Sequence, residues 1–250
     1  MMNFKDHFSK QATDYAKYRP GYPQELFAYL ASLCRERATA WDCGTGNGQA
    51  ALHLREHFQI VIATDPSEKQ IKNAVPHERI FYQISRAEKT AIKSNTIDLI
   101  TVAQAIHWFD FPEFYKEVRR VSKPGGILAV WCYGLLKVSA EIDAAINQFY
   151  NDTVGAYWPP ERKWVDENYR TLPLPFQETT SPPFFMSDNW NLLEMLGYLN
   201  TWSAVQYFIN ANGFNPVEKL IERLQPLWGM ESQKRKITWP LHLRIGKVQP

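Results

Sequence analysis

The sequence predicts an α/β fold with a mostly parallel sheet and helices on both faces. Short β-branched runs alternate with amphipathic helical segments through the first half of the 250 residues, a rhythm typical of parallel strands joined by crossover helices. A glycine-rich turn follows the first run, and an acidic residue stands near the end of each of the first two. Open α/β sheets bind ligands at this edge, so the pattern also predicts a binding site.

The first half supplies the elements of this sheet in order. A helix over 23–33 precedes it, with leucines on one face. A second helix follows the glycine turn, and Ser67 caps a third, with Gln70 at the capping-box position. Pro112 begins a fourth helix, which ends at the turn 124–126. The expected strands are 39–43, 59–64, 80–84, 97–103 and 126–131.

The second half departs from this rhythm. Prolines and aromatic residues fill 151–190, which is too apolar for a disordered linker and is expected to form ordered loops and a cap. Pro240 interrupts the last strand pattern, so a bulge or an edge position is expected there. Helices are expected over 142–149, 191–210 and 216–228. We predict a single domain over 1–250, divided into an N-terminal lid (1–38), a ligand-binding core (39–131), a helical and aromatic cap (132–235) and a final strand (236–246).

Composition narrows the class of protein. A formal charge of +2 gives no general case for nucleic-acid binding, and the basic run 234–236 is too short to change this. The three cysteines form no CxxC pair, which favours a reducing, cytoplasmic location without structural zinc. No apolar run is long enough for a membrane span. The segment 53–57 matches the zinc motif H-x-x-E-H, but a third ligand is missing and no metal site is expected.

The glycine turn itself reads D-x-G-x-G-x-G, from Asp42 to Gly48. Glycines at every second position let the backbone lie against a ligand and adopt positive φ. The dinucleotide fingerprint is instead G-x-G-x-x-G, so a nicotinamide dehydrogenase is the less favoured alternative. Asp65 ends the second strand about 20 residues further on, where a carboxylate can accept hydrogen bonds from both ribose hydroxyls of a nucleoside.

Together these motifs resemble those of the class I S-adenosylmethionine (SAM) methyltransferases. The matching segments are 44–48, Asp65, 87–88, Asp98 and 124–126. Segments 8–11, 15–23, 103–109 and 199–205 further resemble the trans-aconitate methyltransferase-like, type 11 group, so the resemblance covers nearly the whole chain. It implies a Rossmann-like fold with a mostly parallel seven-stranded sheet, an N-terminal helical lid, a C-terminal cap and SAM as cofactor.

The resemblance also implies which residues bind SAM. Gly44 and Gly46 are expected at its methionine portion, Asp65 at the ribose, and Ala87 with Glu88 at the adenine. Gln104 is expected near the amino-acid end of the cofactor. Arg19 can pair with the methionine carboxylate. Tyr15 and Tyr18 either flank the sulfonium by cation–π attraction or pack within the lid. The full expected set is Tyr18, Arg19, Asp42, Gly44, Thr45, Gly46, Asp65, Pro66, Ala87, Glu88 and Gln104.

His107 and Trp108 point to the acceptor. They follow the fourth strand and resemble the His-Trp pair of the juvenile hormone acid and salicylate-type carboxyl methyltransferases. In those families a Trp and an N-terminal Gln bind the substrate carboxylate, and Trp108 and Gln11 match them here. A carboxylic acid with a pKa of about 4.3 is ionised at neutral pH and needs no base. A hydroxyl acceptor would instead use His107 as general base. A third interpretation makes His107 a buried hydrogen-bonded residue and Trp108 part of the core.

The expected function is SAM-dependent methyl transfer to a small molecule, at the carboxylate oxygen of an organic acid. One alternative is another small-molecule acceptor, such as a hydroxyl, with His107 as base. Another is a non-catalytic SAM-binding regulatory protein. Nucleic acid is not expected as a partner, because the segment after the fourth strand lacks the N/D-P-P-Y/F motif of amino-methylating DNA enzymes. The oligomeric state stays open.

Overall fold

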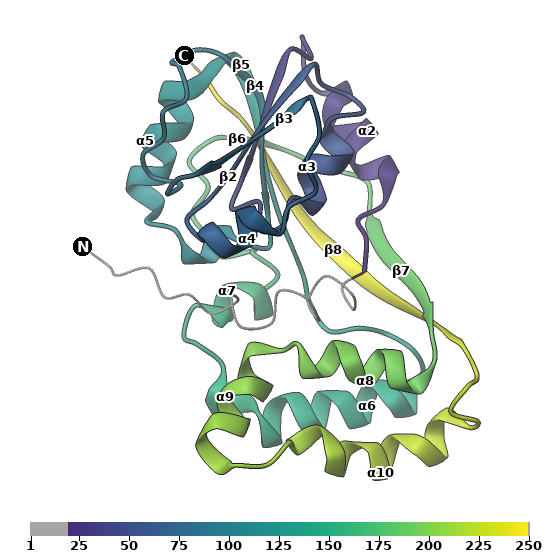
Figure 1. Cartoon of the computed structure of the whole chain (residues 1–250). Helices are drawn as coiled ribbons and strands as arrows, with labels where there is room; N and C mark the ends of the chain where they lie inside the picture. The colour runs from purple at the N-terminus through teal and green to yellow at the C-terminus, as the bar shows by residue number, and fades with distance from the viewer. Residues whose placement is uncertain (1–19, 250) are drawn as a thin grey trace.

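The computed structural model describes residues 20–249, which form a mixed sheet and a separate layer of helices (Figure 1). The sheet order is β3-β2-β1-β4-β5-β8-β6, and β7 also pairs with β8. Its strands are β1 (Thr39–Cys43), β2 (Ile60–Asp65), β3 (Ile80–Ile84), β4 (Ile97–Ala103), β5 (Ser122–Tyr133), β6 (Gln177–Thr179), β7 (Phe184–Trp190) and β8 (Arg235–Lys247).

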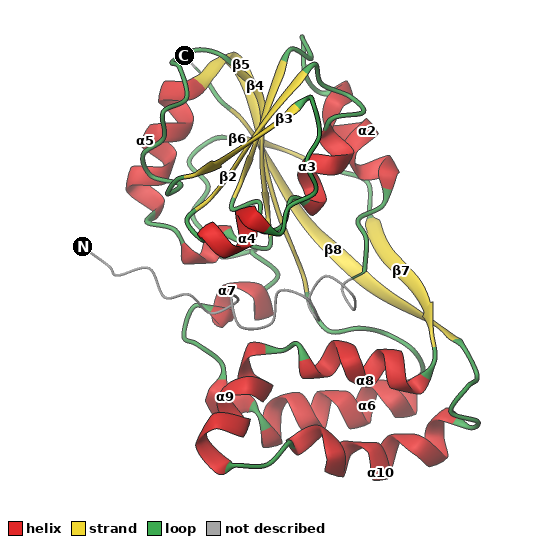
Figure 2. Ribbon diagram, in the orientation of Figure 1, coloured by secondary structure: helices red, strands yellow, loops and turns green. Residues whose placement is uncertain are grey.

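The first five strands confirm the predicted parallel sheet. β1 pairs with β2 and β4, β2 with β3, and β4 with β5, all in parallel. β4 is buried along nearly its whole length because helices cover both faces of the sheet. The helices α2 (Gln24–Ser32) and α3 (Gln49–Leu54) contribute to one hydrophobic cluster, and α5 (Phe111–Val121) contributes to the other. Figure 2 shows them on opposite sides of the strands.

The sheet contains eight strands rather than seven, because two short strands share its last position. β6 pairs antiparallel with residues 245–247 of β8, and β7 pairs antiparallel with residues 235–241. The segment 151–190 therefore contributes strands as well as the expected loops. Its strands escaped prediction because β6 is exposed throughout and β7 buries only Met186 and Trp190, which leaves no alternating apolar pattern.

Pro240 lies inside β8 without disrupting the sheet. β5 pairs with β8 only as far as Leu241, whereas β7 continues past Pro240 on the other side. Thr238, two residues earlier, exchanges backbone hydrogen bonds with Lys137 beyond the end of β5. The nitrogen of Pro240 faces the same side, where β5 has already ended. β8 is therefore an interior strand, but at Pro240 the described residues give it a strand partner on one side only, β7, which is the local equivalent of the expected edge position.

The second half builds the helical layer. Its helices are α6 (Ala140–Gln148), α8 (Leu192–Asn200), α9 (Ser203–Asn212) and α10 (Pro216–Trp228), and the short α7 (Arg162–Asp166) lies between this layer and the sheet (Figure 1). The helix predicted over 191–210 is divided, because Trp202 adopts an extended backbone between α8 and α9. No helix among residues 20–249 has both the length and the apolar composition needed to cross a membrane.

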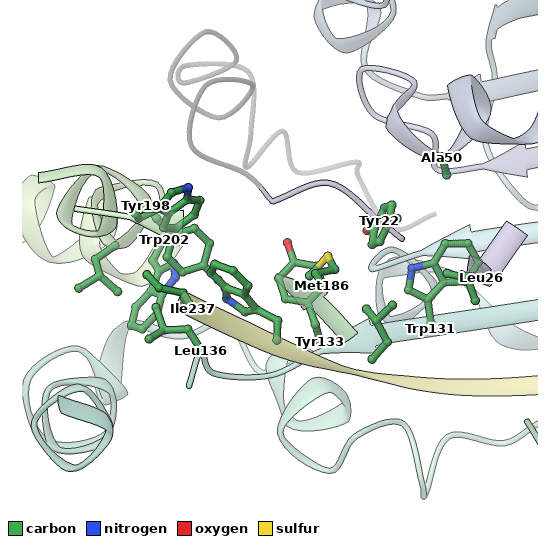
Figure 3. Close-up of a cluster of buried hydrophobic side chains, with 14 of the residues drawn as sticks. Tyr22, Leu26, Ala50, Trp131, Tyr133, Leu136, Met186, Tyr198, Trp202 and Ile237 are labelled. Carbon is green, nitrogen blue, oxygen red and sulfur yellow. The ribbon is translucent and has the colours of Figure 1, made fainter. Parts of the chain in front are cut away.

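One hydrophobic cluster joins the two layers (Figure 3). It runs from Leu26 and Trp131 beside the sheet, past Tyr133 and Ile237, to Trp202 in the helical layer. All five side chains are buried. Because this core is continuous, the helical layer is held against the edge of the sheet where the parallel strands end.

Candidate functional site

The carboxyl ends of β1, β2 and β4 bring those predicted cofactor residues that lie within 42–66, together with Gln104, to one edge of the sheet. The glycine loop after β1 is fastened to the end of β2. The backbone N–H groups of Gly44 and Thr45 donate to the Thr64 carbonyl at 2.8 and 2.9 Å. The helix α4 (Glu68–Lys72) begins just after β2, capped by Ser67, whose hydroxyl accepts from the Gln70 N–H as predicted.

Glycine is favoured at positions 44 and 46 of the loop, for different reasons. Gly44 and Gly46 both have positive φ, +69° and +57°. A Cβ added to Gly44 would lie 2.7 Å from the Cβ of Ala105, so the loop is packed closely against the segment after β4. A Cβ added to Gly46 would meet no atom of residues 20–249 within 4 Å. Gly46 therefore presents bare backbone to open space, which suits close contact with a cofactor.

Asp42 lies beneath this loop rather than on its surface. Its side chain is only 1% exposed. It accepts hydrogen bonds from the hydroxyls of Thr45, at 2.5 Å, and Thr101, at 2.9 Å. Burial raises the pKa of Asp42 to about 6, although these hydroxyls favour the ionised form. Asp42 and Thr45 therefore bond to each other inside the loop and hold its backbone in place. We expect any effect of these two side chains on SAM binding to be indirect, through the position of that backbone.

Asp65 joins the two segments expected to surround the ribose. One carboxylate oxygen accepts from the Gly46 N–H and the other from the Ser67 N–H, each at 2.9 Å. Pro66 lies between Asp65 and Ser67. A carboxylate can accept about four hydrogen bonds in all, so one carboxylate can bond to several donors at once. The glycine loop and the Asp65 carboxylate therefore form one unit.

Three further predicted cofactor residues, Ala87, Glu88 and Gln104, follow β3 and β4 at the same edge. Ala87 is buried, and the Glu88 carboxylate accepts from the Asp110 N–H at 3.1 Å and pairs with Arg86 at 3.3 Å. Gln104 has a positive φ of +56°, unusual for a residue with a side chain. Its Oε1 accepts from the Tyr133 N–H at 2.9 Å, so it links the ends of β4 and β5.

A pocket lies between this edge and the helical layer. One wall comes from the ends of β4 and β5 and the 3-10 turn η2 (Ile106–Trp108), and the other from residues of the helical layer and α7. The walls include Gln104, His107, Trp108, Tyr133, Trp158, Arg162, Tyr198 and Trp202. Aromatic rings therefore dominate a space that also contains a guanidinium and an imidazole.

His107 in this pocket is neutral and its tautomer is fixed. The residue is 7% exposed, and burial, with a contribution from the Arg162 charge, lowers its pKa to about 3. Its Nδ1 lies 2.7 Å from the hydroxyl of Tyr169, which is fully buried. The buried hydroxyl of Tyr169 needs an acceptor for its proton, and Nδ1 lies within reach of it, so we assign Nδ1 as that acceptor. Nδ1 therefore accepts, and Nε2 carries the hydrogen.

The structure places the remaining predictions as follows. His107 is buried and hydrogen-bonded, as one interpretation expected, but it also lines the pocket together with Trp108. Gln11, Tyr15, Tyr18 and Arg19 lie outside the described residues. In the H-x-x-E-H segment, His53 stacks on Phe27 with ring centroids 4.7 Å apart. No group of three or more possible metal ligands gathers within residues 20–249.

Sequence reasoning missed the residues that complete the pocket. Arg162, Trp158 and Tyr169 come from the aromatic segment that was expected only to cover the site. Their available signal was weak, a single arginine just after the Trp158-Pro159-Pro160 run. Arg162 lies in the charged run 161–167, where Asp166 pairs with it at i,i+4, so its sequence context does not distinguish it from an ordinary helix ion pair.

Comparison with known proteins decides the family. Residues 41–130 match the methyltransferase domain family. A Dictyostelium discoideum protein assigned as a methyltransferase is 35% identical over 98% of this chain and 96% of its own. The chain belongs to the class I SAM-dependent methyltransferases. The predicted enzyme class, fold and cofactor are thereby confirmed.

Solved structures agree with this assignment. A type II methyltransferase from Anaeromyxobacter dehalogenans is 41% identical, with a TM-score of 0.88 over 93% of this chain and 99% of that one. A methyltransferase from Bacillus halodurans shares the fold at 16% identity, with a TM-score of 0.51 over 91% of this chain and 99% of that one. The sequence motifs were enough to identify this family because the glycine loop and Asp65 each directly follow a strand that is recognisable in the sequence. We call the carboxyl ends of β1, β2 and β4, with the residues that follow them, the cofactor edge.

Proposed function

We propose that this methyltransferase transfers the methyl group of SAM to a carboxylate oxygen of a small organic acid. The observation that carries the proposal is the state of His107. A histidine with a pKa of about 3, whose Nδ1 accepts a hydrogen bond from Tyr169, offers the pocket an N–H donor and not a base. An acceptor bound beside it has to be nucleophilic without losing a proton, and a carboxylate meets that requirement.

The residues of the chain act by binding and orientation in this reaction. SAM, when bound, supplies an electrophilic methyl group on a positively charged sulfur. The Nε2–H of His107 and the indole N–H of Trp108 are suited to hold carboxylate oxygens in place. Aromatic walls formed by Trp158 and Trp202 exclude water, which favours attack by a bound carboxylate over its solvated form.

SAM itself is proposed to lie along the edge described above. The open side of Gly46 supports contact with the methionine portion, and Asp65 supports contact with the ribose. Ala87 and Glu88 follow β3 on the same edge and are proposed to border the adenine. Gln104 is proposed to adjoin the amino-acid end of SAM. The roles of Gln11, Tyr18 and Arg19 remain those that the sequence resemblance implies.

The same features support proposals about the size of the acceptor, the division of the chain and the cellular location. An aromatic pocket covered by the helical layer favours a small acceptor over nucleic acid. The division into lid (1–38), core (39–131), cap (132–235) and final strand (236–246) fits a site that lies between core and cap. All three cysteines are free, which supports the expected cytoplasmic location. Membership of the trans-aconitate-like group is part of this proposal.

The test uses SAM labelled in its methyl group, the purified protein and a cell metabolite extract. Products are treated with alkali and assayed for volatile label. Methanol released from a methyl ester gives volatile label, which is the expected result. Label that alkali does not release means that the acceptor atom is a hydroxyl oxygen, an amine nitrogen or a carbon. In that case His107 is again a candidate base. No label in any extract supports a non-catalytic SAM-binding protein.

A further inference from the structure

We propose that Arg162 is the anion-binding residue of the pocket and that it selects acidic acceptors. The inference rests on the proposed function, because it assumes that the methyl acceptor binds in this pocket. It adds a specific residue, contributed by the part of the chain that covers the site. The ligand class is an organic anion, recognised through a carboxylate.

The first argument is the way in which Arg162 is held. Its Nε donates to the Tyr150 hydroxyl at 2.9 Å and to Asp166 Oδ1 at 3.3 Å. The Tyr150 hydroxyl in turn donates to Asp166 at 2.5 Å. The guanidinium also lies over the Trp158 ring, 4.5 Å from its centroid. One edge and one face of the planar group are therefore fixed before any ligand binds.

The second argument is the part of Arg162 that stays unpaired. Within residues 20–249, its two terminal nitrogens have no hydrogen-bond partner, because every protein contact goes to Nε. The side chain is only 18% exposed, and the residue lines the pocket. A guanidinium fixed along one edge and free at its fork is preorganised for the two parallel hydrogen bonds of a carboxylate.

The third argument is electrostatic. Asp166 is half-exposed and shares its carboxylate with Tyr150, so it neutralises Arg162 incompletely. The charge of Arg162 reaches across the pocket and contributes to lowering the pKa of His107. The pocket therefore combines a cation with a neutral N–H donor at His107. An anionic acceptor is attracted by the first and oriented by both, whereas a neutral acceptor would leave the charge of Arg162 only partly neutralised, by Asp166.

The experiment compares three variants in the labelled-SAM assay. Arg162→Gln removes the charge, and Arg162→Lys keeps the charge but loses the fork. Arg223→Gln is the control, because Arg223 lies on α10, donates to the exposed Gln148 side chain and is not among the residues that line the pocket. The metabolite extract is separated by anion exchange into anionic and neutral fractions, and each is supplied as acceptor over a dilution series. Calorimetric titration with S-adenosylhomocysteine reports whether each variant keeps an intact cofactor site.

We expect wild type to methylate the anionic fraction. Arg162→Gln should lower apparent kcat/KM by about 10- to 100-fold, mainly through KM. Arg162→Lys should fall between it and wild type, and Arg223→Gln should match wild type. S-adenosylhomocysteine affinity should be unchanged in all three. If Arg162→Gln fails to bind S-adenosylhomocysteine, Arg162→Lys decides the question, and wild-type activity in this variant overturns the proposal.

Other outcomes separate this inference from the proposed function. Volatile label that is insensitive to Arg162 supports carboxyl methylation and overturns the role of Arg162. Stable label from the anionic fraction that depends on Arg162 supports the anion site and overturns carboxyl methylation. Acceptors found only in the neutral fraction overturn the anion site, and the absence of label in both fractions overturns both proposals.

Discussion

The cofactor edge and the acceptor pocket of this enzyme are built by different means. At the cofactor edge, backbone N–H groups and short side chains such as Asp65 and Thr45 bond to neighbours on adjacent strands and loops. The proposed acceptor pocket uses long side chains, such as Arg162 from α7 and Trp202 from the helical layer. We therefore expect affinity for SAM and choice of acceptor to be separable, because the two proposed sites are built from different parts of the chain.

The largest expected effects concern the two glycines. Gly44→Ala should lower the free energy of unfolding by about 2–4 kcal/mol, from overpacking against Ala105 and left-handed strain together. Gly46→Ala should cost about 1–2 kcal/mol from strain alone, yet weaken SAM binding because its methyl group occupies the open side of the loop. Urea unfolding without cofactor, followed by calorimetry with SAM, measures both. Equal stabilities would contradict this account of the loop.

Asp65→Ala should weaken SAM binding by about 1.5–3 kcal/mol, the contribution of hydrogen bonds to a charged group. Asp188→Ala is the matched control, because Asp188 is exposed on β7 and remote from the cofactor edge. Isothermal titration calorimetry compares the two variants with wild type. Unchanged affinity in Asp65→Ala would mean that this carboxylate does not bind the ribose, and the cofactor half of the comparison would need revision.

The smallest effect tests the buried charge beneath the glycine loop. The folded-state pKa of Asp42 is about 6, above the usual 3.9 of an unfolded chain, so the folded protein binds the proton more tightly. The resulting stability is fully present below pH 4 and is lost as pH rises through 6. From pH 5 to 7.5, wild type should lose about 1.4 kcal/mol relative to Asp42→Asn. Urea unfolding of both proteins at the two pH values checks this, and parallel pH dependence would contradict it.

Much of the cofactor edge was predictable because its residues are encoded by local spacing. Gly44, Gly46 and Asp65 follow strands whose apolar patterns are clear, and parallel strands bring their carboxyl ends together. The acceptor pocket was not predictable in the same way. Tyr169 meets His107 across 62 residues of sequence, and no periodicity encodes that contact. β6 and β7 were missed for a related reason, since exposed strands lack the alternation that marks a half-buried one.

The position of β8 has a consequence for how the chain is completed. This strand of thirteen residues lies between β5 on one side and both β6 and β7 on the other. At about 5–20 residues per second, synthesis leaves β5 as an open edge until β8 has also been made. An unpaired strand edge is a site for mistaken pairing with another chain. Newly made molecules thus pass through a brief aggregation-prone interval, which ends when β8 pairs with β5 and covers this edge.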